Sequence, residues 1–127
     1  RTRGMAKKAR PLTPQRGEIY LVNFDPSFGS EIRKTRPALI VQNDIANHFS
    51  PVTIVAAITS YREESLYPTE VFIRKGEAGI HQDSVVLLNQ IRTIDTQRLV
   101  RRLESLGAET MARVDLAIKI SLGLIKV

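Results

Sequence analysis

Residues 29–44 read GSEIRKTRPALIVQND, a charged segment that runs into an apolar strand through an Arg-Pro step. Pro37 fixes its own φ angle and disfavours the α conformation at the residue before it, so Arg36 is expected in an extended conformation at the strand entrance. A cation held in one place at the mouth of a loop is a candidate anion site. An ion pair of Arg36 with Glu31 or Asp44 is the alternative that spacing alone leaves open.

Five short segments of the chain are predicted to be strands because they are apolar or alternate in polarity. They are residues 18–24, 38–43, 53–60, 69–74 and 84–93. Residues 44–51 are predicted to form a turn and residues 61–68 a polar loop. The last strand turns from apolar to polar at Asn89-Gln90, which suggests that it leaves the core and enters a site.

Two helices are predicted after the strands. Asp95 or Thr96 is expected to cap a helix that Gly107 ends, and Thr110 is expected to cap the last helix, from Met111 to about Ile125. The last helix has two apolar stripes, so it is expected to pack on its own sheet and on a second copy of the chain. Strands followed by helices, without alternation, predict a small antiparallel barrel or curled sheet with appended helices.

Composition bounds the function further. The 127 residues suit one domain. The net charge of +6 comes largely from five basic residues among the first ten, so the remaining 117 residues are nearly neutral and the overall charge does not argue for a nucleic-acid partner. Residues 1–14 are expected to be a disordered basic tail and residues 15–127 the single domain; Met5 is a candidate natural start, which would make residues 1–4 an addition. Without cysteine or an apolar run of about 20 residues, the chain is expected to be cytoplasmic and not in a membrane.

The residue types present favour phosphodiester chemistry. No carboxylate cluster or histidine pair has metal-ligand spacing, so neither a metal nor a cofactor is expected, and His48 and His81 are predicted to be solvated turn residues. Arg36 is suited to hold a phosphate through its planar guanidinium. Thr59, at the polar end of an apolar strand, is a candidate to hydrogen-bond the same phosphate, although threonine is also an ordinary strand residue.

Four blocks of the chain, in order and at matching spacing, resemble the MazF/PemK family of toxins. They are residues 16–20, 29–44, 50–60 and 83–95. The resemblance implies an SH3-like antiparallel barrel with a C-terminal helix, as in CcdB and PemK proteins, and a homodimer. It also implies a metal-independent endoribonuclease that cuts single-stranded RNA by attack of the 2′-hydroxyl, and a MazE-like antitoxin as its inhibitor.

Functional residues follow from this resemblance one by one. The family's catalytic arginine and threonine fall on Arg36 and Thr59. Its RNA contacts fall on or beside Phe28, Glu31, Asn43, Asn89 and Gln90. Residues 32–35 depart from the glycines that many relatives carry, so the base preference is not transferable. The alternatives are a toxin of the same fold that binds DNA gyrase, as CcdB does, and a non-catalytic RNA-binding barrel.

Overall fold

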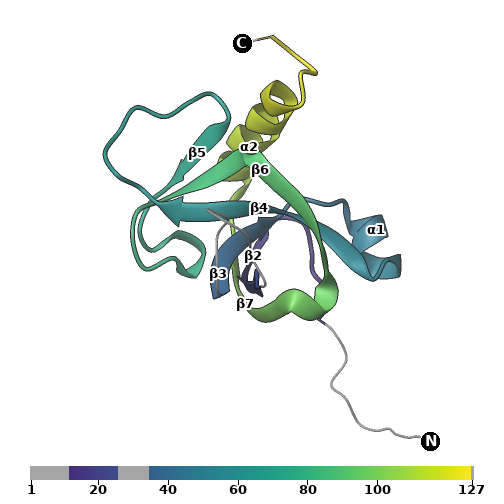
Figure 1. The fold of residues 1–127 in the computed structure, drawn as a ribbon. Coiled ribbons are helices and arrows are strands. Elements are labelled where there is room, and N and C mark those ends of the chain that lie inside the picture. Colours follow the sequence, from purple (N-terminus) through teal and green to yellow (C-terminus); the bar gives the residue numbers. More distant parts are fainter. Residues whose placement is uncertain (1–11, 26–34, 127) are drawn as a thin grey trace, which may run out of the picture.

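The computed structural model describes residues 12–25 and 35–126. These ranges contain six strands, two α-helices and two single-turn 3-10 helices. Figure 1 labels the strands and the two α-helices. The strands are β2 (Glu18–Asn23), β3 (Thr35–Ile40), β4 (Val52–Ser60), β5 (Glu70–Ile73), β6 (Ser84–Asp95) and β7 (Leu99–Ser105). The helices are α1 (Asp44–Phe49), η1 (Glu77–Gly79), η2 (Thr96–Arg98) and α2 (Ala108–Ser121). None of the helices in the described ranges is long and apolar enough to cross a membrane.

The strands form one antiparallel sheet in the order β5-β6-β4-β3-β2-β7. Over the described ranges the two edge strands, β5 and β7, are not hydrogen-bonded to each other, so the sheet curls like a small barrel without closing. The predicted fold class, a small antiparallel barrel with a C-terminal helix, is confirmed. All five predicted strands are present, with ends shifted by at most three residues.

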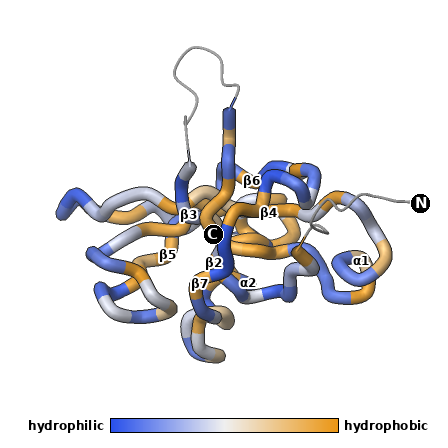
Figure 2. Tube along the Cα trace, turned by 90° about the horizontal axis from the view of Figure 1, so that it is seen from below, coloured by the Kyte–Doolittle hydropathy of each residue, from blue (hydrophilic) through white to orange (hydrophobic). Residues whose placement is uncertain are grey.

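Alternate residues of the central strands point to opposite faces of the sheet. One face packs against α2 through the buried Val114 and Ala117, and we call it the helix face. Its buried strand residues include Ile19, Leu39, Ala56, Ile58, Val71, Ile73 and Val86. The opposite face, here called the second face, carries Tyr20, Val22, Ala38, Ile40 and Val55 in a separate core cluster. Figure 2 shows the apolar colouring concentrated along the strands and the hydrophilic colouring at many of the chain turns.

Arg16 ties α2 to the start of the sheet. Its Nη2 lies 2.7 Å from Oδ1 of Asp115 on α2, and its Nε donates to the carbonyl of Val41 at 2.9 Å. The next residue, Gly17, has φ of +96°, which a side chain would strain, and its amide donates to the carbonyl of Ile40. The turn before β2 therefore fixes both the helix and the end of β3.

The predicted helix over residues 95–106 is wrong. Asp95 does cap a helical turn, because its Oδ1 accepts the amide of Gln97 at 2.8 Å, but the turn is only the three residues of η2. The chain then continues as β7, which pairs with β2. Leu99 and Leu103 are four residues apart, which fits one side of a helix, whereas in the strand β7 they pack against different core clusters. Pairing with the otherwise unpaired edge of β2 decides between the two, since it satisfies the backbone of both strands.

The helix ends near α1 and α2 also differ from prediction. Residues 44–49 form the short helix α1 instead of a turn, capped by Asn43, whose Oδ1 accepts the amide of Ala46 at 2.8 Å. α2 begins at Ala108 with Gly107 as its N-cap, so Thr110 does not cap it. The Thr110 hydroxyl donates to Glu77 at 2.8 Å instead. α2 ends at Ser121, before Gly123 with φ of +74°, and not near Ile125.

Candidate active site

Arg36 and Thr59 lie on neighbouring strands near the same end of the sheet. Arg36 is exposed at the start of β3, and Thr59 is half-buried near the end of β4. The β3–β4 pairing matches Ala38 with Ala57. Continued by two residues, the same register brings Arg36 opposite Thr59, and residues directly opposite in an antiparallel pair share a face. The two candidate catalytic residues are thus on the second face, away from α2.

The second face continues from Thr59 toward the β5 edge. Val85 of β6 lies opposite Thr59, and Leu87, two residues further on, lies opposite Glu70 of β5. The row that starts at Arg36 therefore runs through Thr59 and Val85 to Phe72 of β5, and Glu70 lies in the next row, opposite Leu87. Across these two rows the second face is cationic at Arg36, apolar at Val85 and Leu87, and acidic at Glu70.

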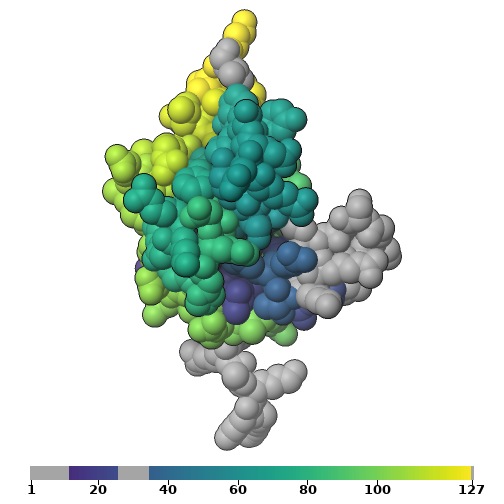
Figure 3. Space-filling model, turned by 90° about the vertical axis from the view of Figure 1, so that its left-hand side faces the viewer, coloured from purple at the N-terminus to yellow at the C-terminus, as the bar shows by residue number. Residues whose placement is uncertain are grey.

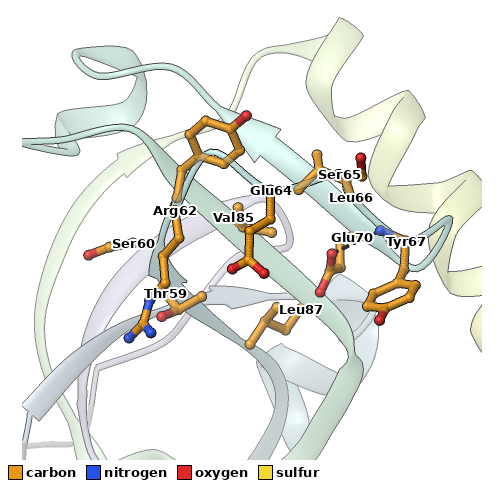
Figure 4. A pocket seen from close by; sticks show the side chains of 11 residues that line it. Thr59, Ser60, Arg62, Glu64, Ser65, Leu66, Tyr67, Glu70, Val85 and Leu87 are labelled. Atoms are coloured by element: carbon orange, nitrogen blue, oxygen red, sulfur yellow. Dashed lines mark hydrogen bonds between the residues drawn. The ribbon is translucent and has the colours of Figure 1, made fainter.

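A cavity of about 260 Å³ opens beside Thr59 on this face. Val85 and Leu87 contribute its apolar lining, and the loop of residues 61–69 contributes most of the rest (Figure 4). Figure 3 shows this loop, in teal, spread over the side of the molecule above the start of β3, in blue. The loop makes a recess out of what would be a flat sheet surface.

Asn89 and Gln90 lie in a bulge of β6. Ala56 and Ala57 are adjacent on β4, but their partners on β6, Ile91 and Leu87, lie four positions apart. Residues 88–90 therefore have no partner on β4 and form the bulge. Both Asn89 and Gln90 are exposed. A bulge re-aims side chains and ends regular pairing, which is the departure from the core that the polar run predicted.

The other predicted RNA contacts are not all brought together. Phe28 and Glu31 lie outside the described residues. Asn43 caps α1 beyond the far end of β3, and at least about 13 Å of strand separates it from Arg36. Asn43 therefore lies apart from Arg36 in this chain, and its contact with RNA stays a prediction. His48 and His81 are both exposed, as predicted, although His48 is in α1 and not in a turn.

Arg92 is a cation on the second face that sequence reasoning did not select. It lies opposite Val55, beyond the bulge, and its guanidinium carbon is 5.3 Å from the centre of the Phe24 ring. The cation–π contact orients the side chain without neutralising it. The signal available in the sequence was the polar run after Leu88, which includes this arginine.

Burial shapes the electrostatics of the second face near β7. Burial raises the pKa of Tyr20 to about 12, and the adjacent Glu18 carboxylate adds to the rise while Arg102 opposes it. Glu18 is itself buried and pairs with Arg102 at 3.1 Å. Tyr20 therefore stays neutral and acts as a hydrogen-bonding core residue. In the described ranges, no three His, Asp or Glu side chains are grouped so that they would hold a metal ion.

Comparison with known proteins places this chain in a family. Residues 15–122 match the family described as PemK-like, MazF-like toxin of type II toxin-antitoxin system. The chain is 49% identical over 111 residues to the endoribonuclease EndoA of Bacillus subtilis, a match that covers 87% of this chain and 96% of the relative. The chain belongs to the PemK-like, MazF-like toxins.

Solved structures show the same fold. MazF from Deinococcus radiodurans superposes with a TM-score of 0.73 at 27% identity, covering 88% of this chain and 98% of that chain. An endoribonuclease in complex with its cognate antitoxin, from a mycobacterial species, gives a TM-score of 0.73 at 23% identity over 90% of this chain and 99% of that chain.

Proposed function

We propose that this protein is a toxin endoribonuclease that cleaves single-stranded RNA within a short sequence, without a metal ion, and so inhibits translation and growth. Family membership and the 49% identity to EndoA support this activity. They favour it over the gyrase-binding and non-catalytic alternatives. The single observation that carries the site is the β3–β4 register, which sets Arg36 opposite Thr59 on a face that α2 leaves uncovered.

In the reaction that this site supports, the 2′-oxygen of the RNA attacks the adjacent phosphorus. The bond from phosphorus to the 5′-oxygen breaks, the 2′-hydroxyl gives up its proton, and the departing 5′-oxygen takes one. The products are a 5′-hydroxyl and a 2′,3′-cyclic phosphate, which hydrolysis converts to a 3′-phosphate. Arg36 stabilises the charge on the phosphate oxygens and takes part in proton transfer, and the Thr59 hydroxyl positions the scissile phosphate.

The RNA-binding surface in this proposal extends along both sides of the catalytic pair. Asn89 and Gln90 present amide groups to base edges from the β6 bulge, and Phe28, Glu31 and Asn43 complete the set that the family resemblance assigns. The exposed amides in the bulge support the first part of this assignment.

The proposal includes two protein partners. A MazE-like antitoxin inhibits the toxin, in keeping with a type II toxin-antitoxin family. A second copy of the chain covers the outward side of α2, where Leu116 is 51% exposed, and the residues after the helix, where Leu122 and Leu124 are more exposed still. We place the protein in the cytoplasm, where its RNA substrate is translated. Sedimentation that yields only monomer at every protein concentration would exclude the dimer.

The activity is tested with a long single-stranded RNA in excess EDTA. The wild-type protein is expected to cleave it at discrete positions, and Arg36→Ala is expected to remove cleavage while circular dichroism stays unchanged. Arg101→Ala is the matched control, because Arg101 is also an exposed strand arginine but lies on the edge strand β7. Intact RNA with the wild-type protein would exclude the proposed activity, and cleavage by Arg36→Ala would exclude the assigned residue.

A further inference from the structure

The cavity beside Thr59 is lined by carboxylates, which neither phosphate binding nor the proposed reaction requires. Glu64 and Glu70 both contribute to its lining, together with Thr59 and Arg62. Figure 4 shows the Glu64 carboxylate pointing into the cavity, with Thr59 and Arg62 on one side and Glu70 and Tyr67 on the other. In this view Arg62 lies on the side of Thr59, where cleavage is proposed, and Glu70 lies on the opposite side of the cavity.

The loop that builds this cavity is held in one shape. The Tyr67 amide donates to Oε1 of Glu70 at 2.9 Å, and Tyr61 packs edge-on against Phe72 with ring centres 5.1 Å apart. Glu63 has φ of +59°, a left-handed conformation that a residue with a side chain keeps only where its surroundings require it. The recess is therefore a built feature of the loop, which supports a binding role.

The occupant of such a recess is not a phosphate, because two carboxylates repel an anion at close range. Carboxylate oxygens accept hydrogen bonds, so they suit a ligand edge rich in donors. Tyr67 is 70% exposed, and an aromatic ring at the rim of an acceptor-lined cavity is the arrangement that holds an unstacked base. A volume of about 260 Å³ lies below the roughly 300–1,000 Å³ of ordinary small-molecule sites and suits a single base.

We propose that this cavity is a base-selecting subsite for the nucleotide next to the scissile phosphate. It takes a base with an exocyclic amino group, namely cytosine, adenine or guanine, and rejects uracil. Glu64 and Glu70 accept hydrogen bonds from the amino-bearing edge, and Tyr67 stacks on the base. Uracil has no amino group, and its one ring N–H on that edge lies between two carbonyl oxygens, so a carbonyl oxygen faces a carboxylate. The inference rests on the proposed function, because Thr59 defines which nucleotide is adjacent.

The test is a binding selection that does not depend on cleavage. The Arg36→Ala protein is incubated with random single-stranded RNA heptamers, and the bound RNA is sequenced. We expect one position at which uracil is depleted by at least about fivefold relative to the amino-bearing bases. Adding Glu64→Gln and Glu70→Gln is expected to reduce that depletion to about twofold or less, since glutamine offers a donor as well as an acceptor. Glutamine at position 70 also keeps an oxygen for the Tyr67 amide.

Two further variants separate stacking and general charge from selection. Glu104→Gln with Glu109→Gln removes the same charge from exposed positions outside the cavity, and we expect the depletion of uracil to persist. Tyr67→Ala is expected to weaken binding of the selected RNA by about fivefold or more, and Tyr67→Phe to restore it.

Uracil accepted at every position by the Arg36→Ala protein, no retention of RNA, or a depletion that survives both glutamine substitutions would each overturn the inference. Failure of the proposed function gives a different result, because RNA left intact by the wild-type protein does not alter the base preference that the selection measures.

Discussion

Asn47 is expected to be one of the most costly residues to truncate, although it lies in the six-residue helix α1. It is buried, and its Oδ1 accepts from Gln42 Nε2 at 3.0 Å and from the Thr53 hydroxyl at 2.7 Å. Its Nδ2 donates to the carbonyl of Gln42 at 3.0 Å and to Asp44 Oδ1 at 3.3 Å. One side chain thus joins the exit of β3 to the start of β4, the two strands that carry the proposed catalytic pair.

Replacement of Asn47 by alanine leaves two buried polar groups without these partners. The Thr53 hydroxyl, at 0% exposure, loses its acceptor, and the Gln42 carbonyl loses its donor, while Gln42 Nε2 keeps the carbonyl of Val52 at 3.0 Å. Each unsatisfied buried group costs about 1–3 kcal/mol, so Asn47→Ala is expected to lower the free energy of unfolding by about 3 kcal/mol. Water entering from the adjacent surface pocket, which Asn47 lines, keeps the loss in the lower half of the range.

The assay is urea unfolding followed by far-ultraviolet circular dichroism, at one fixed protein concentration because association affects apparent stability. Thr53→Val removes the hydroxyl without removing volume. In the double variant the orphaned donor no longer exists, so the loss is expected to be smaller than the sum of the single losses by about 1 kcal/mol. A cost below about 1 kcal/mol for Asn47→Ala, or single losses that add within about 0.3 kcal/mol, would refute this reasoning.

Three further predictions concern the start of the sheet. Tyr20 has its pKa raised from near 10 to about 12, so its contribution to stability is complete below pH 10 and is lost as the pH rises toward 12. Between pH 10 and 12 the wild-type protein should lose about 3 kcal/mol of unfolding free energy, measured by urea unfolding at each pH, and Tyr20→Phe should not show this loss. The same dependence of stability on pH in both proteins would contradict the prediction. Gly17→Ala should lower stability by about 1–2 kcal/mol through its positive φ, since there is room for a methyl group; an unchanged urea midpoint would disprove the strain. Arg16 and Asp115 should show a coupling of about 0.5–1 kcal/mol in a double-mutant cycle with Arg16→Gln and Asp115→Asn, because both side chains are partly exposed. That coupling should shrink in 1 M salt, and a larger value that salt leaves unchanged would mean that the pair acts as a buried one.

The sequence predicted the sheet better than it predicted the ends of the helices. Strands such as β4 are recognisable because their apolar run is continuous and β-branched. β7 was missed because its leucines fit helical spacing, and only the open edge of β2 decides its conformation. Strand pairing is a contact between distant parts of the chain, and local propensity does not contain it.

The candidate site was predictable in part. Arg36 was identified because a proline follows it, and Thr59 because it ends an apolar strand, but the register that relates them appears only in the folded sheet. The cavity was not predictable, since it depends on the path of residues 61–69 and on the single left-handed residue Glu63. The sequence of that loop indicated only that it is polar.

The bulge in β6 divides that strand into two halves that pair with β4 in different registers. The ladder on either side of residues 88–90 has its own register, so a change of length between Leu88 and Ile91 does not have to propagate into either half. Leu88 itself is committed to the core and to a hydrogen bond with the Thr69 carbonyl. Insertions or deletions confined to Asn89 and Gln90 would therefore change the two bulge residues that are predicted to contact RNA and leave the core residues of β6 in register.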